Sequence, residues 1–227
     1  MPTDAMHKAL LKELNDSLGS LISAGIVDDQ HFFILKQVGK DDWNLVFEGS
    51  DGISVAYESD GYDSLYDSLH DGKIFSAKMI DGALVQMLYQ IRNGAVHKHR
   101  LAFYPAPALD PFRERSDGYF EDHVFVDVVS RKIIPSPVRV DYDKEAHVEL
   151  SHPACHMTLG DAECCRIPVS SPVSPKWFWD FILRNFYSVG DFKFHDLLPS
   201  AQVSWEPTLT KSELGIVYLA IPSTQFK

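Results

Sequence analysis

The chain has 227 residues, of which 45% are hydrophobic and 23% are charged. These proportions are typical of a globular protein and exclude wholesale disorder, and the length suits one domain with a sizeable core. The formal net charge of -11 argues against general electrostatic binding to nucleic acid or to an anionic membrane, although it leaves room for a local basic site.

The N-terminal segment and the cysteines together indicate a protein of a reducing compartment. The N-terminal segment has no cationic stretch followed by an apolar run, so it does not read as a secretory signal. No stretch approaches the roughly 18 apolar residues that a membrane helix needs. The chain has 3 cysteines, an odd number, and Cys164 and Cys165 are adjacent, which suits no disulfide framework. We therefore expect a cytoplasmic protein with no membrane contact, no disulfide and no structural zinc.

The N-terminal part predicts one helix followed by strands. Apolar residues recur at steps of three and four over 4–24, and Gly25 follows as a stop, so we expect a helix that packs on a sheet within 1–28. Residues 31–38 and 43–48 read as strands separated by a Gly-Lys-Asp-Asp turn. A third strand is expected over 53–57, and the acidic stretch 59–72 is expected to be a loop or a short exposed helix.

The middle of the chain predicts a second helix and another strand. Residues 80–93 place apolar side chains on one helical stripe, and Gly94 stands where a C-terminal glycine belongs, so we expect a central helix. The stripe consists of Ile80, Leu84, Met87, Leu88 and Ile91. Residues 96–104 then read as a strand, and residues 105–122, rich in proline, glycine and charge, read as a mobile surface loop.

The C-terminal part predicts two strands, a long apolar helix and a last strand. Residues 138–143 and 147–159 read as strands joined by a turn. Ser174 and Pro175 form a good helix start, and the helix that follows is apolar on most sides, so we expect it to be buried or covered by a partner through Trp177 and Trp179. Within this helix, Phe181→Ala is expected to cost about 3–5 kcal/mol.

Residues 215–222 read as a buried final strand. The pattern as a whole is not a regular alternation of strands and helices. We therefore predict an α+β fold over 1–227, a single domain with a largely antiparallel sheet, an N-terminal helix, a central helix and a long apolar C-terminal helix.

The stretch from Ser151 to Gly160 contains two histidines, His152 and His156, at the spacing of a helical zinc motif. Pro153 lies between them and favours extended structure, in which the two residues would stand roughly 13 Å apart at about 3.3 Å per residue. A shared metal is therefore disfavoured. Each histidine is instead a core or edge residue, or one member of a site completed by other strands.

The cysteines offer an alternative metal site. Cys155, Cys164 and Cys165 together with one of the histidines would supply four ligands, but adjacent cysteines bind one ion poorly. The simpler interpretation is that they are small buried residues.

Two charged positions nearby favour an anion site. Arg166 precedes the start of the C-terminal helix, where a guanidinium and free N–H groups together bind phosphate or carboxylate; the alternative is an ion pair with Asp141 or Asp143. These two aspartates share one face of a strand end, where they would bind Mg²⁺, act as a base or cap a turn. A second basic patch contains Arg92, His99 and Arg100, with a solvent-exposed strand and helix end as the alternative.

Five segments of the sequence resemble one protein family. They are residues 84–94, 99–107, 137–143, 151–160 and 165–187, of which the last is long and specific. On these the chain resembles the bacterial family known as "domain of unknown function 2290". The resemblance implies a stand-alone bacterial protein, often encoded near mobile-element or phage-defence genes, without an established activity.

In this family the three cysteines are not part of the pattern. The resemblance places the family's polar positions at Arg100, Asp141, His152, His156 and Arg166. Polar residues spread over three segments are typical of a shared site, and also of a buried polar network.

We therefore expect a phosphate-binding site that hydrolyses phosphodiesters of nucleic acid or nucleotide. His152 and His156 would be the acid–base residues, Asp141 would orient a histidine, and Arg100 and Arg166 would bind phosphate. Such a site would also accept a bound metal such as Mg²⁺, but it does not require one. The alternative is a non-catalytic partner or regulator in a multi-gene defence or toxin system, which would bind the product of a neighbouring gene through Trp177 and Trp179.

Overall fold

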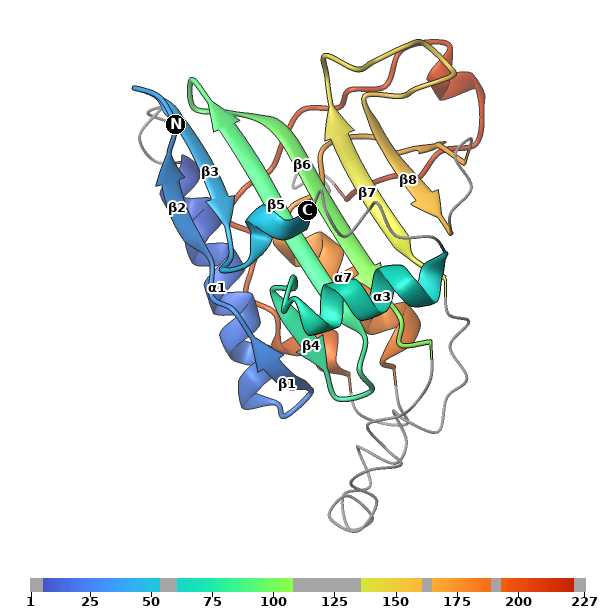
Figure 1. Ribbon diagram of the computed structural model, residues 1–227. Coiled ribbons are helices and arrows are strands. Elements are labelled where there is room, and N and C mark those ends of the chain that lie inside the picture. The colour runs from blue at the N-terminus through green and yellow to red at the C-terminus, as the bar shows by residue number, and fades with distance from the viewer. Residues whose placement is uncertain (1–5, 54–60, 108–135, 161–164, 189–192, 223–227) are drawn as a thin grey trace, which may run out of the picture.

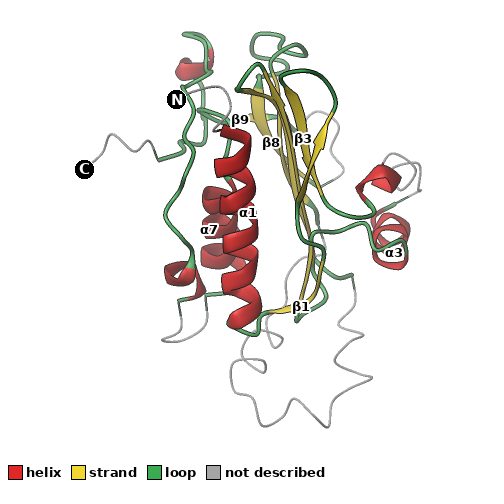
Figure 2. Ribbon diagram, turned by 90° about the vertical axis from the view of Figure 1, so that its left-hand side faces the viewer, coloured by secondary structure: helices red, strands yellow, loops and turns green. Residues whose placement is uncertain are grey.

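The computed structural model describes residues 6–53, 61–107, 136–160, 165–188 and 193–222. These residues form one sheet with helices on both faces (Figures 1 and 2). Helices α1 (Met6–Ser23) and α7 (Pro175–Phe186) lie together on one face, and α3 (Tyr62–Asp71) lies on the other. The prediction of a mixed fold of helices and an antiparallel sheet is confirmed.

The sheet has 9 strands, and every pairing between its named strands is antiparallel. The strands run along the path β1-β4-β5-β6-β7-β8-β9, while β3 also pairs with β5 and β2 pairs with β3. Their bounds are β1 (Val27–Gln30), β2 (Ile34–Gln37), β3 (Asp42–Val46), β4 (Ala77–Met79), β5 (Leu84–Arg92), β6 (Ala95–Tyr104), β7 (Val138–Asp143), β8 (Cys155–Leu159) and β9 (Ile167–Pro168). Short 3₁₀ helices lie at Ser50–Gly52, Phe194–Leu197 and Glu213–Gly215.

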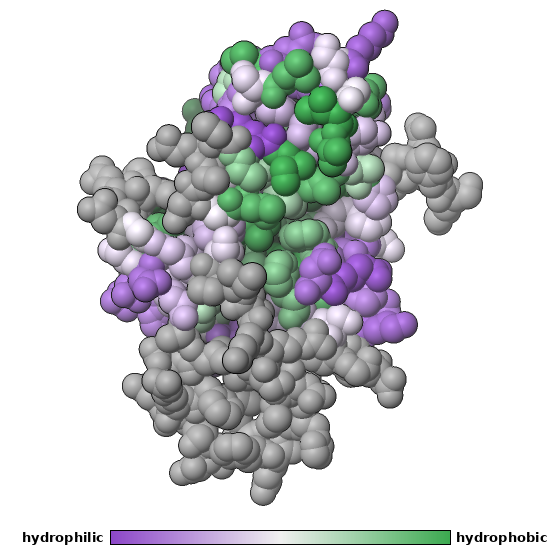
Figure 3. Space-filling view, turned by 90° about the vertical axis from the view of Figure 1, so that its right-hand side faces the viewer, coloured by the Kyte–Doolittle hydropathy of each residue, from purple (hydrophilic) through white to green (hydrophobic). Residues whose placement is uncertain are grey.

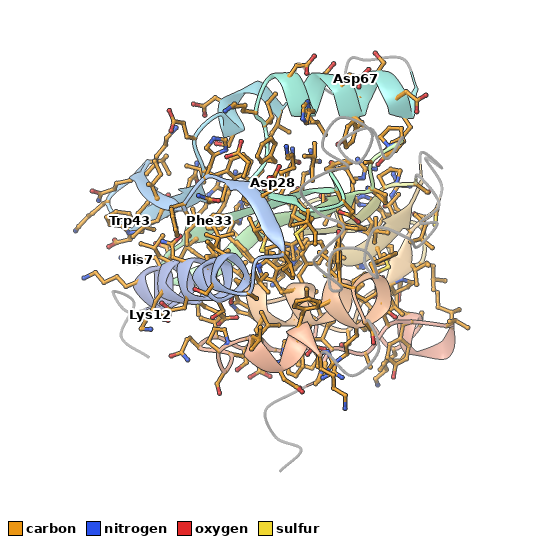
Figure 4. The ribbon with its side chains drawn as sticks, turned by 90° about the horizontal axis from the view of Figure 1, so that it is seen from below. His7, Lys12, Asp28, Phe33, Trp43 and Asp67 are labelled. Carbon is orange, nitrogen blue, oxygen red and sulfur yellow. The ribbon has the colours of Figure 1, made fainter. Side chains whose placement is uncertain are left out.

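The N-terminal helix packs on the sheet as the leucine spacing predicts. Leu10, Leu14 and Leu18 are fully buried, and the ring of His7 stacks on Trp43 of β3 with 4.5 Å between the ring centroids. Seen from below, α1 lies against one side of the sheet and α3, which carries Asp67, lies on the opposite side (Figure 4). The acidic segment therefore does contain a helix, one of the two outcomes expected for it.

The predicted central helix over 80–93 is wrong, because this segment contains β5, a strand in the middle of the sheet. Its first four residues, 84–87, are all buried, since this part of the strand is covered on both faces. A strand covered on both faces has no polar side, so its apolar residues also fit a helical stripe. Asn93 and Gly94 form the hairpin turn to β6 and both have positive φ, as a two-residue turn of this kind requires.

The C-terminal segments also differ from the predictions. The predicted strand 147–159 is a strand only from Cys155 to Leu159, because a tight turn bridges Val148 and His152 before it. Residues 215–222 are mostly exposed rather than buried, with Val217 85% exposed. The final helix begins at Pro175 as predicted, but it has 12 residues and exposes one side, so it is neither long nor apolar all round.

Two predicted segments fall largely outside the described residues. Ile53 is helical, and the rest of the strand predicted over 53–57 is not described. The same holds for the loop predicted over 105–122, apart from its first three residues. Among the helices that the structure describes, none has the length and apolar character that crossing a membrane requires.

Candidate functional site

A cavity of about 640 Å³ opens on the face of the sheet that is turned away from α1 and α7. On the α7 side of the sheet, Nε2 of His99 accepts a hydrogen bond from the N–H of Val173 at 3.0 Å. Side chains alternate along a strand, so Arg100 points to the opposite face. On that face α3 covers one end of the sheet, where Tyr66 donates to the carbonyl oxygen of Gly82 at 2.6 Å. Most residues that line the cavity belong to β6, β7 and β8 or to the turns beside them, and Figure 1 shows these three strands side by side.

The strand register places three of the predicted site residues side by side. Arg100 of β6 pairs with Asp141 of β7, which pairs in turn with His156 of β8. The Nε atom of Arg100 donates to Oδ1 of Asp141 at 3.0 Å. All three residues line the cavity together with His152 and Arg166. The structure thus brings the five predicted residues to one place, although their roles remain predictions.

The same face adds three residues that were not predicted, Lys98, Arg139 and Thr158, beside Asp143, which was. Arg100, Asp141 and His156 form a row across the three strands. On one side of this row Lys98 and Asp143 form an ion pair at 2.8 Å. On its other side Arg139 of β7 pairs with Thr158 of β8. All four line the cavity. Lys98, Arg139 and Thr158 each stand two positions along a strand from a predicted site residue. Strand alternation was therefore the signal that would have found them.

The two histidines are much closer together than a straight strand would allow. Their ring centroids are 4.8 Å apart, so the predicted separation is wrong. His156 lies in β8, while His152 lies in the turn before it, and the chain bends at Ala154 between them. Because the segment folds back at this bend, the two imidazoles meet in the cavity.

Both imidazoles are held by backbone carbonyl groups through the same ring nitrogen. Nδ1 of His152 is 2.6 Å from the carbonyl oxygen of Ala146, and Nδ1 of His156 is 3.0 Å from that of Pro153. A carbonyl oxygen only accepts hydrogen bonds, so Nδ1 carries the proton in each ring. In the neutral form Nε2 of each ring is then the basic atom.

Burial favours the neutral form of two histidines in this region. It lowers the pKa of His156, against the opposing effect of the Pro153 carbonyl and the Asp141 carboxylate, while the positive charge of Arg166 lowers it further. Burial also lowers the pKa of His99 to about 4. His156 is therefore suited to accept a proton near neutral pH, whereas His99, on the core side, stays neutral.

The cationic groups differ in how far their charge is compensated. Arg100 and Lys98 are paired with Asp141 and Asp143. Within the described part of the chain, Arg166 forms no hydrogen bond or ion pair, so it does not pair with either aspartate. Four Lys or Arg side chains and two carboxylates line the cavity, which makes it locally basic in a protein of net charge -11.

The residues of the cavity suit an anion better than a metal ion. Cys155 points into the core, where burial raises its pKa well above the usual range, and Cys164 lies outside the described residues. In the described ranges no group of three or more His, Cys, Asp and Glu side chains is arranged to hold a metal. Asp141 and Asp143 each face a cationic side chain instead.

The sequence model of the family described as "Uncharacterized conserved protein (DUF2290)" matches residues 26–221. The chain belongs to this family. The match includes every cavity residue named above, so the site lies within the DUF2290 region. No curated protein and no solved structure shows significant similarity to the chain.

The two tryptophans predicted for an interface have different surroundings in this DUF2290 protein. Trp179 is fully buried in the core, so its side chain is not available to a partner. Trp177 is partly buried, and Nζ of Lys176 lies 4.0 Å from the centroid of its ring. Only Trp177 remains as a surface residue of the pair.

Proposed function

We propose that this DUF2290 protein hydrolyses phosphodiester bonds in nucleic acid or nucleotides. The observation that carries the proposal is the pair of Nδ1-protonated imidazoles, 4.8 Å apart, beside the uncompensated guanidinium of Arg166. Two imidazoles next to a bound phosphate can serve as general base and general acid. An arginine stabilises the negative charge that develops on the phosphoryl oxygens.

In the proposed reaction His156 is the base, because burial favours its neutral form. Its Nε2 takes a proton from a water molecule while the water oxygen forms a bond to phosphorus. The bond from phosphorus to the leaving oxygen breaks, and that oxygen receives a proton from Nε2 of protonated His152. His156 ends protonated and His152 ends neutral, so one proton transfer between them through solvent restores the starting state.

Asp141 and Arg100 have a supporting role in this mechanism. The Asp141 carboxylate lies beside His156 across the strands and stabilises its protonated form after the proton transfer. The hydrogen bond from Arg100 at 3.0 Å holds that carboxylate in place. Removal of Arg100 would therefore lower the rate through Asp141 and His156 rather than through phosphate binding.

The test is hydrolysis of bis(p-nitrophenyl) phosphate and of single-stranded RNA and DNA oligonucleotides by the full chain. His156→Ala and His152→Ala should each reduce the rate by about 100-fold or more, as the loss of an acid–base group does. The matched control is His70→Ala on α3, whose ring lies outside the cavity. Wild-type protein without activity on any of these substrates, or full activity in either cavity variant, would contradict the proposal.

A cellular role in defence against phage, or in a toxin system, rests on the family resemblance. If the cavity acts in that setting, bacteria that express the wild-type protein together with its neighbouring genes should restrict phage growth, and those with His156→Ala should not. Equal plating of phage on both strains would contradict this role for the site.

A second candidate function is binding of a protein partner as a regulator. Exposed apolar residues gather in two loops next to the cavity, and Figure 3 shows hydrophobic side chains in a band on the β8 side of the molecule. They include Val148, Leu150, Leu214, Ile216 and Val217. An exposed apolar patch is typical of an interaction surface. Val217→Asp with Leu214→Asp should abolish co-purification with the product of a neighbouring gene while leaving hydrolysis intact.

A further inference from the structure

We infer that the phosphoryl group binds at Thr158 and Arg166, with Arg139 on the far side of Thr158, and not at Arg100. The inference rests on the proposed function, because this site would hold the phosphate of the substrate. Phosphate binding can nevertheless be measured without any catalysis. It adds Thr158 and Arg139 to the site and changes the role expected for Arg100.

The strand register places these residues in one row across the sheet. Arg139 of β7 pairs with Thr158 of β8. On the other side of β8, Met157 pairs with Ile167, so the next step of the same register sets Arg166 opposite Thr158. Side chains that face each other across antiparallel strands have Cβ atoms about 4.5–5.5 Å apart. The Thr158 hydroxyl therefore stands between two arginines, and all three residues line the cavity.

The row lies directly beside the histidines. Thr158 and His156 are two residues apart on β8, so they share a face at a separation of about 7 Å. A phosphate at Thr158 then has its ester oxygens within reach of the imidazoles. This is the spacing that a proton transfer to or from a bound phosphodiester needs.

The hydroxyl group of Thr158 is placed to bind a polar ligand in the cavity. The residue is 5% exposed, yet its side chain forms no hydrogen bond with any residue that the structure describes. Within the described residues its hydroxyl oxygen is not among the fully buried atoms that lack a partner, so it is open to the cavity, where valine would offer no hydrogen bond. Because Thr158 lines the cavity, a ligand bound there would replace water as the partner of this hydroxyl.

The distribution of charge directs an anion to the same row. The charge of Arg100 is opposed by Asp141 and that of Lys98 by Asp143, in contacts of 3.0 Å and 2.8 Å. Arg166 has no such partner among the described residues. Beside Thr158 a phosphate would therefore meet the positive charge of Arg166. Beside Arg100 it would meet an ion pair whose net charge is close to zero. An arginine and a hydroxyl together match the several acceptor oxygens of a phosphate.

The experiment uses inorganic phosphate as the probe and the full chain, with binding followed by titration in two-dimensional ¹H–¹⁵N NMR. Thr158→Val, which keeps the shape and removes the hydroxyl, and Arg166→Gln should each weaken phosphate binding by about 10-fold or more. Thr158→Ser keeps the hydroxyl and should retain affinity. Thr208→Val is the matched control, because its hydroxyl is buried without a partner but lies outside the cavity.

The outcomes separate this inference from the proposed function. Phosphate affinity unchanged in Thr158→Val, or lost only in Arg100→Gln, would overturn the inference even if the histidines prove essential for hydrolysis. Phosphate binding that depends on Thr158 and Arg166 would support the inference even if no phosphodiester is cleaved. If Thr158→Val does not fold, Thr158→Ser and Arg166→Gln decide the question.

Discussion

The buried carboxyl group of Glu213 accepts a hydrogen bond from Nε2 of His147 at 3.1 Å. The other carboxyl oxygen accepts one from the N–H of Thr210 at 2.9 Å. The residue before His147 is Ala146, whose carbonyl oxygen holds Nδ1 of His152 at 2.6 Å. The segment near the C-terminus therefore fixes the loop that orients one of the two cavity histidines.

Glu213→Gln should disturb His152 without removing it. The amide keeps one acceptor oxygen but offers an N–H₂ group where His147 now donates, so the loop should shift. We expect hydrolysis to fall by about 10–100-fold, as for other residues that hold a catalytic histidine through a neighbour. Long-range ¹H–¹⁵N NMR should show the His152 ring losing its single Nδ1–H tautomer. Glu206→Gln, an exposed control, should change neither. An unaltered His152 spectrum in Glu213→Gln would show that the contact does not position the ring.

The sequence predicted the architecture better than the identity of each element. Leucine spacing and a Ser-Pro start located α1 and α7, because both helices bury one side and expose the other. Residues 84–92 could not be assigned from apolar spacing, since a strand buried on both faces has no polar side to define its period. The better signal there was Asn93-Gly94, which favours a hairpin more strongly than a helix end.

The sequence predicted which residues belong to the site, but it did not predict how they are arranged in space. Motif positions identified Arg100, Asp141 and His156, and the register of β6, β7 and β8 explains why they meet. The approach of His152 to His156 depends on a bend at Ala154 that has no local signature. The pairing of charges also depends on register, which is why the sequence left open whether Arg166 pairs with Asp141 or Asp143, and why the pairing of Arg100 with Asp141 was not predicted.

Glu13→Ala should destabilise the protein strongly. The carboxyl group of Glu13 is fully buried and accepts hydrogen bonds from the backbone N–H groups of Lys176, Gln202 and Val203, at 3.0, 2.6 and 3.2 Å. It thereby joins α1 to the start of α7 and to the segment after it. Alanine would remove the partner of three backbone donors, of which that of Val203 is buried, and would leave a cavity, at a cost of about 3–5 kcal/mol in urea unfolding. The exposed neighbour Lys12→Ala should cost less than about 0.5 kcal/mol, and equal effects would contradict the assignment.

Two phenylalanines of α7 should differ in their contribution to stability. Phe178 is 1% exposed, whereas Phe181 is only partly buried and touches the ring of Phe186. Phe178→Ala should therefore cost about 3–5 kcal/mol in the free energy of unfolding, which is the figure first expected for Phe181. Phe181→Ala should cost clearly less, about 1–2 kcal/mol. A larger loss for Phe181 than for Phe178 would mean that this side of α7 is covered by a second chain.

Arg166→Gln should raise the pKa of His156. Burial is the main cause of the lowered pKa of this histidine, and the positive charge of Arg166 adds to it by disfavouring the protonated ring. Without that charge, protonation becomes easier and the pKa moves up. The ring ¹H–¹³C NMR signals of His156 report this pKa directly, and the acid limb of the rate profile should move to higher pH with it. Lys176→Gln, at a residue of α7 that does not line the cavity, should leave the titration unchanged. A pKa that stays put or falls would show that Arg166 does not face His156.

The protein should lose stability in weak acid because of His99. Burial holds the pKa of its ring at about 4, below the ordinary value of 6.5, and its Nε2 accepts the N–H of Val173 only when that nitrogen is unprotonated. The unfolded chain binds a proton as the pH falls through 6.5, but the folded chain does so only near pH 4. The neutral ring of His99 therefore adds roughly 3 kcal/mol to the free energy of unfolding. This stabilisation is complete above about pH 6.5 and is lost by about pH 4. His99→Gln keeps an acceptor for Val173 and should remove this part of the slope, as measured by urea unfolding at several pH values against His70→Gln. If the free energy of unfolding changed with pH in the same way for His99→Gln and the wild type, the fold would not hold this ring neutral.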